Sequence, residues 1–344
     1  MKSAVFLGKQ NIQVLEREIP KPGPGEVLIK VMACGVCGSD VHIFDGDQGS
    51  TSTVPPQVQG HEFSGVVVET GSEVTSCKVG DRVCVDPADN CNECYYCANG
   101  MMGHCENMGA IGTNIDGGLS QYCKVPGRLI HHLADDVTFI QGAMAEPLAC
   151  CINGADRSDI KVSDNVVIYG GGMIGLLLLQ LAKLKGAANV VLVEPVETKR
   201  KMAEQLGATF TVDPRAENVK EALLAHGLKH IQVVIETCGL KSTSEEAIDI
   251  VDRRGTVVLF AVTKVDSGID LKTYQLFQNE LTIKGSYCSP YDMGRAVELL
   301  NAHRIDVTTM LAGTKPLEGL VEVLSDPKVR AQGKWAILPN GPVD

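Results

Sequence analysis

From about Val166 onward, short runs of β-branched residues alternate with longer helical segments, and this alternation constrains the fold more than any other feature. Continuous apolar runs flanked by helices are typical of a parallel sheet that is buried on both faces. We therefore predict a doubly wound α/β domain in this part of the chain. The predicted strands lie at 166–169, 190–193, 233–235 and 257–260, and the predicted helices between them at 174–185, 197–206 and 243–251.

The first 145 or so residues follow a different pattern, in which short strands are separated by Gly and Pro. Candidate strands lie at 27–31, 65–69 and 81–85, and this pattern predicts a β-rich domain. Near the end, 293–302 reads as a helix and 333–338 as a strand. Periodicity does not say which domain this last part joins. With 344 residues and 44% hydrophobic content, the chain exceeds the usual size of one core, so two domains are expected.

The charge balance limits the partners that the protein can bind. A formal net charge of -11 argues against the broad basic surface that phosphate backbones require, so we expect no nucleic-acid partner. The opening residues 1–8 are too short an apolar stretch for a signal peptide, and the apolar run 174–181 is too short to cross a bilayer. We expect a cytoplasmic protein without a membrane partner.

A glycine-rich turn follows the first predicted strand of the α/β part and fits G-x-G-x-x-G. Between a buried strand and a helix, the first glycine makes the turn, the second lets a pyrophosphate approach the backbone, and the third packs helix on sheet. The helix N-terminus then offers free N–H groups to the phosphates. The alternative is a glycine turn in a doubly wound fold that binds no nucleotide. The predicted cofactor-binding residues of the turn are Gly170, Gly172, Met173, Ile174 and Gly175.

An acidic residue follows the next predicted strand. Glu194 lies 19 residues after Gly175, where a carboxylate can accept hydrogen bonds from the adenosine ribose hydroxyls. A carboxylate there repels a 2′-phosphate, so the sequence favours NAD over NADP. Lys199, which we include among the cofactor-binding residues, and Arg200 are basic groups near the same ribose and weaken that preference.

Four cysteines form a compact C-x2-C-x2-C-x7-C loop: Cys91, Cys94, Cys97 and Cys105. Four soft thiolates fit a closed tetrahedral zinc site of a structural kind. An iron–sulfur cluster is the serious alternative, whereas disulfides are disfavoured in a reducing compartment. We interpret the remaining eight cysteines as ordinary small side chains in or near the core; they are Cys34, Cys77, Cys84, Cys123, Cys150, Cys151, Cys238 and Cys288.

A second, less obvious metal group lies earlier in the chain. Cys37 belongs to the segment 34–42, and His61 and Glu62 follow some 24 residues later. A thiolate and an imidazole are good zinc ligands, and a carboxylate from elsewhere completes three, leaving one position for water or a substrate oxygen. This is the arrangement of a catalytic zinc site. Taken singly, His61 and Glu62 would be read as a structural histidine and a surface charge.

Taken together, these residues resemble the zinc-dependent medium-chain alcohol dehydrogenase family, and within it the sorbitol/xylitol-type polyol dehydrogenases. The resemblance covers essentially the whole chain. It implies a GroES-like β-rich catalytic domain made of residues 1–146 and 286–344, and a doubly wound Rossmann domain at 147–285. The matching motifs occur in the family order and are 34–42, 60–62, the four-cysteine loop, 145–148 and the glycine turn.

The resemblance also assigns roles around the catalytic zinc. It places the third ligand at Glu146, in the Ala145-Glu146-Pro147-Leu148 segment, and makes Glu62 the neighbouring carboxylate that can replace a ligand or hold the zinc-bound water. Cys150 and Cys151 are the alternative third ligands. Ser39 would take the substrate proton and His42 would relay it.

Asp40 is expected to orient His61 through its other ring nitrogen. The alternative readings are Ser39 as a helix cap, His42 as a surface histidine and Asp40 as a turn residue.

The expected activity is hydride transfer from a secondary hydroxyl of a polyol or sugar alcohol, phosphorylated ones included, to NAD, with two zinc ions per chain. One departure concerns the substrate: sorbitol-type enzymes carry arginine then tyrosine after the Lys-Gly that ends the Rossmann domain, but here 284–289 lacks the arginine. An L-threonine 3-dehydrogenase-like enzyme and a non-enzymatic zinc and NAD-binding homologue are the alternatives. The family pattern is a homodimer or homotetramer.

Overall fold

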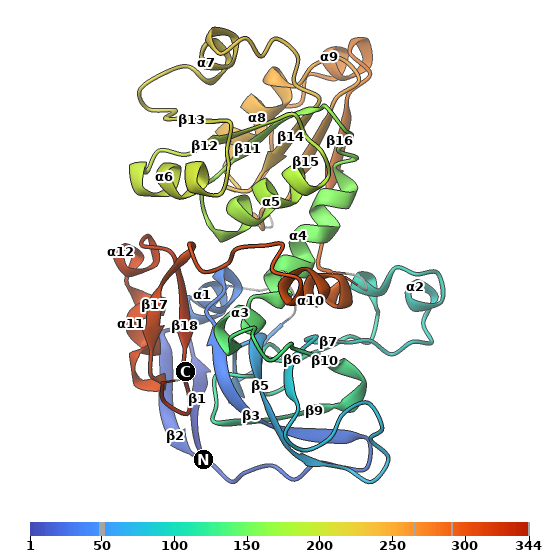
Figure 1. The fold of residues 1–344 in the computed structure, drawn as a ribbon, viewed down its shortest axis with the longest axis vertical. Helices are drawn as coiled ribbons and strands as arrows, with labels where there is room; N and C mark the ends of the chain where they lie inside the picture. The colour runs from blue at the N-terminus through green and yellow to red at the C-terminus, as the bar shows by residue number, and fades with distance from the viewer. Residues whose placement is uncertain (48–51, 265, 290–291, 343–344) are drawn as a thin grey trace. The chain divides into compact units, whose positions relative to one another are not determined.

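The computed structural model describes residues 1–47, 52–264, 266–289 and 292–342. The chain divides into two compact units (Figure 1). Unit 1 comprises Met1–Ala149 and Pro290–Asp344, and unit 2 comprises Cys150–Ser289. Helix α4 (Ala145–Arg157) carries the chain from the first unit into the second.

Unit 2 is built on a six-stranded sheet in which every neighbouring pair is parallel, in the order β13-β12-β11-β14-β15-β16. The order reverses direction at β11, which places a crevice at the carboxyl ends of the strands, where doubly wound folds bind nucleotides. The strands are β11 (Asn165–Tyr169), β12 (Asn189–Val193), β13 (Phe210–Val212), β14 (Val233–Glu236), β15 (Thr256–Leu259) and β16 (Thr282–Gly285).

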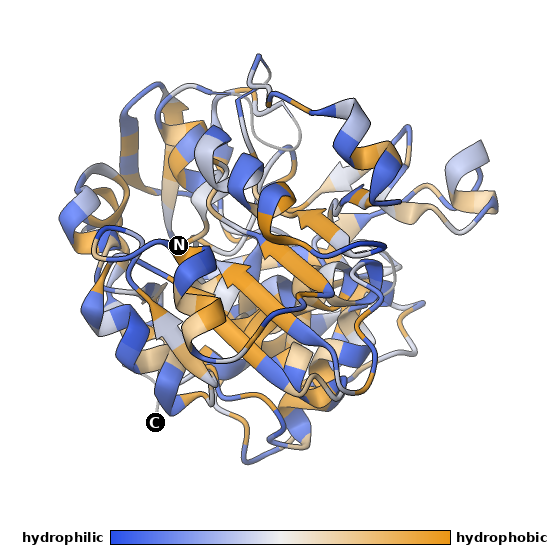
Figure 2. Cartoon of the chain, turned by 90° about the horizontal axis from the view of Figure 1, so that it is seen from above, coloured by the Kyte–Doolittle hydropathy of each residue, from blue (hydrophilic) through white to orange (hydrophobic). Residues whose placement is uncertain are grey.

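Helices pack against this sheet because its strands are apolar on both faces. Helix α5 packs against β11 and β12, α6 against β12 and β13, and α8 against β14 and β15. Figure 2 shows the strands in the centre of the view as strongly hydrophobic, with helices of mixed hydropathy around them. The predicted doubly wound domain is confirmed. The helices of this unit after α4 are α5 (Met173–Leu184), α6 (Glu197–Gln205), α7 (Val219–Ala225), α8 (Lys241–Ile250) and α9 (Thr273–Gln278).

Unit 1 is rich in β-structure, as predicted. Its largest sheet has the order β10-β6-β5-β3-β18-β17, with β9 also paired to β3, and a smaller sheet has the order β2-β1-β4. Strands β7 and β8 form a two-stranded ladder. The strands are β1 (Lys2–Gly8), β2 (Asn11–Glu16), β3 (Glu26–Gly35), β4 (Gln57–Val58), β5 (Glu62–Thr70), β6 (Arg82–Val85), β7 (Ala88–Asp89), β8 (Gly109–Ala110), β9 (Tyr122–Pro126), β10 (Ile130–His132), β17 (Leu311–Lys315) and β18 (Lys334–Ile337).

The C-terminal segment completes the large sheet of unit 1. Strand β18 pairs with β3 in antiparallel fashion, with Ala336 opposite Gly35, and with β17 in parallel fashion. Apolar side chains from this tail, including Leu320 and Ile337, belong to the same core as Val27 and Phe63. The helices of unit 1 are α1 (Gly38–Phe44), α2 (Tyr95–Ala98), α3 (Phe139–Ala143), the start of α4, α10 (Met293–Asn301), α11 (Leu320–Ser325) and α12 (Pro327–Arg330).

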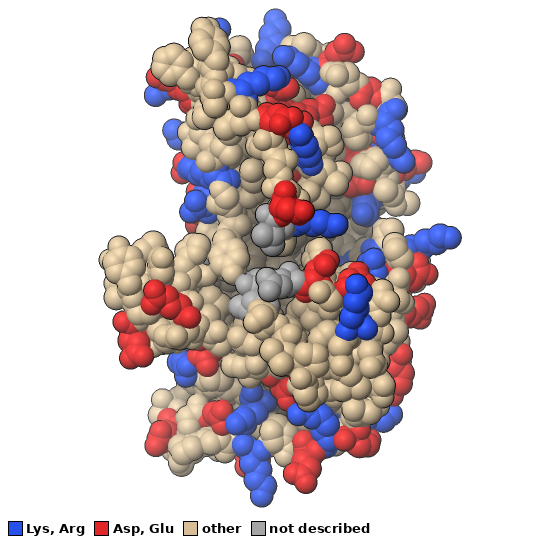
Figure 3. Space-filling model, turned by 180° about the vertical axis from the view of Figure 1, so that it is seen from behind, with Lys and Arg blue, Asp and Glu red and all other residues tan. Residues whose placement is uncertain are grey.

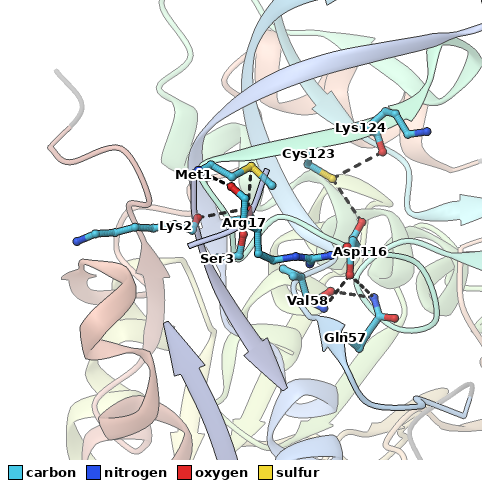
Figure 4. Close-up of polar contacts among 10 residues, drawn as sticks. Met1, Lys2, Ser3, Arg17, Gln57, Val58, Asp116, Cys123 and Lys124 are labelled. Atoms are coloured by element: carbon cyan, nitrogen blue, oxygen red, sulfur yellow. Dashed lines mark hydrogen bonds and ion pairs between the residues drawn. The ribbon is translucent and has the colours of Figure 1, made fainter. Parts of the chain in front are cut away.

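A polar network around Asp116 fixes the strand that leads to His61 (Figure 4). Asp116 Oδ1 accepts hydrogen bonds from the backbone N–H of Val58 at 3.0 Å and from Gln57 Nε2 at 3.2 Å. Its other oxygen lies 2.8 Å from the guanidinium of Arg17. These contacts tie β4 to the neighbouring loop, so the backbone enters the candidate site in a fixed position.

Among the described residues, no helix is both long enough and apolar enough to cross a bilayer. On the face seen in Figure 3, acidic and basic side chains are interspersed.

Candidate active site

The four-cysteine loop forms a compact group of sulfur atoms. The Sγ atoms of Cys91, Cys94, Cys97 and Cys105 all lie within 4.8 Å of one another, and each of these cysteines is free. Cys91 Sγ is 3.5 Å from Cys105 Sγ and 4.0 Å from Cys97 Sγ. A zinc–sulfur bond of about 2.3 Å places the sulfurs of a tetrahedral site roughly 3.8 Å apart. The observed separations fit one metal ion, whereas a cluster would attach the sulfurs to different iron atoms and spread them.

The pKa values of the cysteines in this loop also indicate a metal site. Hydrogen bonds from the backbone N–H groups of Cys97 and Glu106 lower the pKa of Cys94 to about 6. Burial, by contrast, raises the pKa of Cys97 to about 12. Four thiolates therefore cannot coexist at neutral pH unless a cation neutralises them, and the donor set suits zinc.

The second metal group begins at the N-terminus of α1. Cys37 is the N-cap residue and has an extended backbone, with φ -94° and ψ 157°. Its backbone N–H donates to Asp40 Oδ2 at 2.8 Å, which fixes both residues at the start of the helix. An acidic residue in the first turn also suits the positive end of the helix dipole. The helix thereby holds the Cys37 thiol in a defined place.

His61 lies next to Cys37 although 23 residues separate them in the sequence. The ligand atoms of Cys37, His61 and Glu62 all lie within 4.8 Å of one another. His61 Nδ1 is 3.8 Å from Asp40 Oδ1, and both atoms are buried without a hydrogen-bond partner. Burial lowers the pKa of His61, but the negative Cys37 and Asp40 outweigh it and leave that pKa well above its ordinary value. Buried polar atoms of this kind around two soft donors fit a metal ion.

The carboxylates around this group differ in their partners. Glu62 is 1% exposed and contacts Lys334 of β18, whose Nζ lies 2.7 Å from Oε1 and 2.5 Å from Oε2. Burial lowers the pKa of Lys334, but Glu62 and Cys37 raise it more, so the net pKa is above its ordinary value. Sequence reasoning missed Lys334, because its pairing with a residue 272 positions away leaves no local signal.

Glu146, predicted from the resemblance as the third ligand, stands in the first turn of α4 and is half-buried. Its negative charge contributes to the raised pKa of His61. The compact group of ligand atoms contains Glu62 and not Glu146.

The predicted proton-relay residues share helix α1. Ser39 is half-buried, and its Oγ is 3.6 Å from Cys37 Sγ. The side chain of His42 is 47% exposed, and its Nδ1 is 3.7 Å from Asp47 Oδ2. Because residues three apart on a helix are neighbours on its surface, Ser39 and His42 lie on the same side of α1.

A cavity of about 280 Å³ opens beside these residues in unit 1. Cys37, His42, Arg330 and Trp335 are among the residues that line it. Trp335 is the single tryptophan of the chain. Its Nε1 donates to the carbonyl of Val329 at 2.9 Å, which fixes the indole ring. Of the compact donor group, Cys37 lines this cavity.

In unit 2, the glycine turn between β11 and α5 has the geometry of a phosphate-binding turn. Gly170 has φ +104°, which suits glycine, and a Cβ on Gly175 would lie 1.9 Å from the carbonyl oxygen of Gly170. Gly172 is the N-cap of α5, and a Cβ there would meet nothing within 4 Å. The turn thus closes on itself at Gly170 and Gly175 and is open at Gly172. Free N–H groups of Met173 and Ile174 begin the helix at this point.

Glu194 braces this turn. Its Oε2 accepts the N–H of Gly171 at 2.7 Å and its Oε1 accepts the N–H of Val196 at 2.9 Å, and the residue is 6% exposed. Each carboxylate oxygen keeps a second lone pair for a ribose hydroxyl. Arg200 is held by the Glu194 carbonyl at 2.8 Å and by Asp213 at 3.1 Å. Lys199 is half-buried, and its positive charge acts to lower the pKa of Cys238. Cys238 is exposed, so the prediction that it lies in or near the core was wrong.

Two family matches cover most of the chain. Residues 23–135 match the alcohol dehydrogenase GroES-like domain, and residues 173–302 match the zinc-binding dehydrogenase domain. The chain therefore belongs to the zinc-binding alcohol dehydrogenase family, and it is a zinc-dependent dehydrogenase of the medium-chain class.

Curated relatives match over most of the chain. The 2-dehydro-3-deoxy-L-galactonate 5-dehydrogenase of Pseudoalteromonas atlantica is 32% identical over 98% of this chain and 98% of its own length. The D-arabinitol dehydrogenase 1 of Uromyces fabae is 30% identical over 99% of this chain and 97% of its own length. The L-threonine 3-dehydrogenase of Pyrococcus horikoshii is 34% identical over 79% of this chain and 78% of its own length.

Among solved structures, a protein assigned as a zinc-binding dehydrogenase from Sinorhizobium meliloti 1021 superimposes with a TM-score of 0.95. It is 37% identical, covers 98% of this chain and 99% of its own length, and was solved bound to NADP. This similarity confirms the predicted combination of a GroES-like and a Rossmann domain.

Proposed function

We propose that the chain oxidises a secondary hydroxyl of a polyol or sugar alcohol, phosphorylated ones included, to a ketone, with NAD as hydride acceptor. The observation that carries the proposal is the group of Cys37, His61 and Glu62, whose ligand atoms lie within 4.8 Å of one another beside Ser39 and His42. The names of the Uromyces and Pseudoalteromonas relatives describe dehydrogenases of a sugar alcohol and a sugar acid, which supports a polyhydroxylated substrate.

Each chain is proposed to hold two zinc ions. The four cysteines would hold a structural ion, and Cys37, His61 and Glu146 would hold the catalytic one with Glu62 beside it. Zinc bound there would act as a Lewis acid and lower the pKa of the substrate hydroxyl. Asp40 supports this assignment because its Oδ1 faces His61 Nδ1 at 3.8 Å and can hold the ring in one orientation.

Protons leave along α1 in this proposal. Ser39, half-buried beside Cys37, accepts the proton of the substrate hydroxyl. His42, exposed three residues later, passes it to solvent. The order fits the exposure of the two side chains, because the inner group meets the substrate and the outer one meets water.

The cofactor-binding residues are proposed to be Gly170, Gly172, Met173, Ile174, Gly175, Glu194 and Lys199. NAD is preferred because the Glu194 carboxylate is fixed by two backbone N–H groups and repels a 2′-phosphate. Arg200 does not counter it, since its Nη1 bonds to the Glu194 carbonyl and lies 3.1 Å from Asp213. The Sinorhizobium relative was solved bound to NADP. The preference is therefore tested by the ratio of activity with NAD to activity with NADP.

The proposal also covers the domain boundaries and the assembly of the protein. The catalytic domain comprises residues 1–146 and 286–344, and the Rossmann domain comprises 147–285. The protein assembles as a homodimer or a homotetramer, which light scattering on the purified protein would distinguish.

The deciding experiment follows NADH absorbance over a panel of polyols, polyol phosphates, sugar acids and L-threonine, with and without a chelator. Chelator-sensitive turnover of a polyol or a polyol phosphate is the expected result. Turnover of L-threonine alone would replace the proposal with the activity named for the Pyrococcus relative. No turnover of any compound by protein loaded with zinc and NAD would favour a non-enzymatic homologue.

A further inference from the structure

Two carboxylates stand at the carboxyl ends of neighbouring strands in unit 2. Val193 of β12 lies opposite Val212 of β13. The residues that follow these two are Glu194 and Asp213. The N–H of Glu194 donates to the carbonyl of Val212 at 3.0 Å, which keeps the two strand ends together. Glu194 braces the glycine turn, whereas Asp213 contacts two arginines, so the two acids act on different partners.

Asp213 holds both of these arginines. Arg200 Nη1 lies 3.1 Å from Asp213 Oδ2, and Arg215 Nε lies 3.5 Å from Asp213 Oδ1. The backbone N–H of Arg215 also donates to Asp213 Oδ1 at 3.0 Å. This backbone hydrogen bond and the charges of the two arginines hold the pKa of Asp213 below its ordinary value. The carboxylate is therefore charged at neutral pH, and it pairs with two cations at once.

The same guanidinium groups also bond to the loop that follows β12. Arg200 Nη1 donates to the carbonyl of Glu194 at 2.8 Å, and Arg215 Nη2 donates to the carbonyl of Pro195. Both cations therefore flank the residue that is proposed to bind the cofactor ribose. In doubly wound folds an acid at this place binds the 2′-hydroxyl of the ribose, whereas a nearby arginine accommodates a 2′-phosphate. This chain carries both kinds of group.

The contacts of the arginines decide between these two kinds of recognition. An arginine binds phosphate through free N–H groups that its planar guanidinium presents as a fork. The side chain of Arg200 is only 18% exposed, and it is held by the carboxylate of Asp213 and the carbonyl of Glu194. Turning it toward a phosphate would break both contacts and would weaken the neutralisation of Asp213, which is 21% exposed. Leaving a partly buried charged group without its partner costs free energy.

We propose that Asp213 is a positioning residue that withholds Arg200 and Arg215 from the cofactor ribose and so helps to exclude a 2′-phosphorylated nucleotide. The inference rests on the proposed cofactor site, but it does not depend on the substrate or on either metal group. Glu194 repels the phosphate, and Asp213 holds back the cations that would otherwise compensate for this repulsion.

The first test uses two nucleotides that differ only in the 2′-phosphate, adenosine 2′,5′-bisphosphate and adenosine 5′-monophosphate. Calorimetry on the whole protein gives the Kd of each. We expect Asp213→Asn to improve binding of the bisphosphate relative to the monophosphate by about tenfold, the size of one hydrogen bond to a charged group. Asparagine keeps an oxygen for the N–H of Arg215, so the turn should hold its shape. An unchanged ratio of the two Kd values would overturn the proposal.

The second test asks whether the arginines supply this gain. We expect Arg200→Met and Arg215→Met together, in the Asp213→Asn background, to return the ratio to that of the wild type; a gain that persists would contradict the proposal. With Asp213 intact, Arg200→Met alone should change the ratio by less than about twofold, because the donor of Arg200 is already occupied. A tenfold loss of bisphosphate binding there would show that Arg200 is free to bind phosphate. That outcome overturns the proposal even if Asp213→Asn does not fold.

Asp252→Asn is the matched control. Asp252 also accepts a backbone N–H, from Arg253 at 2.8 Å, and pairs with the side chain of His230. It precedes β15 and so lies at the opposite edge of the sheet. Its ratio of Kd values should equal that of the wild type, and a tenfold change would mean that loss of any such carboxylate has this effect, which would overturn the specific role of Asp213.

The outcomes separate this inference from the proposed function. If neither NAD nor adenosine 5′-monophosphate binds the wild-type protein, the proposed cofactor site fails, and the inference fails with it. If both bind and the ratio is unchanged in Asp213→Asn, only the role of Asp213 is overturned. None of these measurements needs a substrate, so failure of the polyol panel would leave them unaffected.

Discussion

The two metal groups of unit 1 are built in opposite ways. The four sulfurs of Cys91, Cys94, Cys97 and Cys105 come from one loop in which backbone N–H groups stabilise a thiolate. The other group takes Cys37 from the start of α1 and His61 and Glu62 from the edge of β5. A loop made of four identical donors satisfies a metal completely. A group assembled from separate elements, with mixed donors, leaves room for a reacting oxygen.

The surroundings of the two metal groups differ as well. The sulfur group packs against Met102, Tyr96 and Met108. The Cys37 group adjoins a cavity and a helix with a serine and a histidine. In the proposed function, a metal held by the first group would maintain the structure, and a metal held by the second would support the reaction. Variants of the residues in each group test that division.

The largest expected effect is that of Cys37→Ser. Loss of the thiolate should remove one zinc per chain and lower kcat by at least a thousandfold, because metal stabilisation of transition-state charge amounts to several kcal/mol. Steady-state kinetics and metal analysis measure both, and NAD binding should stay nearly intact. Cys77→Ser, at a half-buried cysteine outside both groups, is the control. A kcat close to wild type would contradict the catalytic assignment.

Cys97→Ser should show the complementary result. The loop loses its metal, and the melting temperature should fall by about 4 °C, which corresponds to a loss of roughly 3 kcal/mol in a protein of 344 residues. The kcat of the protein that remains folded should stay within about threefold of wild type. Calorimetry and activity per active site check the two parts. A thousandfold loss of kcat without a fall in melting temperature would reverse the roles of the two metals.

Glu194→Ala tests whether the cofactor site is independent of both metals. Removing the carboxylate should narrow the preference for NAD over NADP by about thirtyfold in kcat/KM, equivalent to about 2 kcal/mol, while the zinc content remains at the wild-type level. Glu194→Gln is the matched variant, because its amide oxygen can still accept the N–H of Gly171. An unchanged cofactor ratio in both variants would show that Glu194 only braces the turn.

The smallest effect on activity concerns Asp86, which lies between β6 and β7. Burial raises the pKa of Asp86 from its ordinary 3.8 to about 6, while its Oδ1 accepts the N–H of Ala88 at 3.0 Å. Because the folded pKa is raised, the stabilising contribution of Asp86 is complete below about pH 4 and is lost as the pH rises through 6.

Asp86→Asn should therefore raise the free energy of unfolding by up to about 3 kcal/mol at pH 8 and leave it nearly unchanged at pH 4. Urea unfolding at the two pH values measures the difference, and kcat should not change. An equal effect at both pH values would mean that ionisation of Asp86 is not the cause.

Much of the fold was predictable because its signals are local. The valine-rich runs and the glycine turn locate β11, β12, β14 and β15 within a residue or two. Strand β13 and helix α9 were missed, since Phe210–Val212 and Thr273–Gln278 are too short to show a period. The destination of the C-terminal strand was not readable from periodicity either. Its pairing with β3 depends on a partner about 300 residues away.

The candidate site also contains some features with local sequence signals and others without them. From the sequence alone, the four-cysteine loop and the glycine turn could be predicted, because each lies within one short segment whose spacing fixes which groups can meet. Cys37 and His61, 24 positions apart, were predicted as donors from their residue types and from the resemblance. Only the tertiary structure decided that Glu62, and not Glu146, lies in the compact donor group, and that Lys334 reaches Glu62 past Gly35. Register between strands far apart in the chain sets such contacts, and no local pattern encodes it.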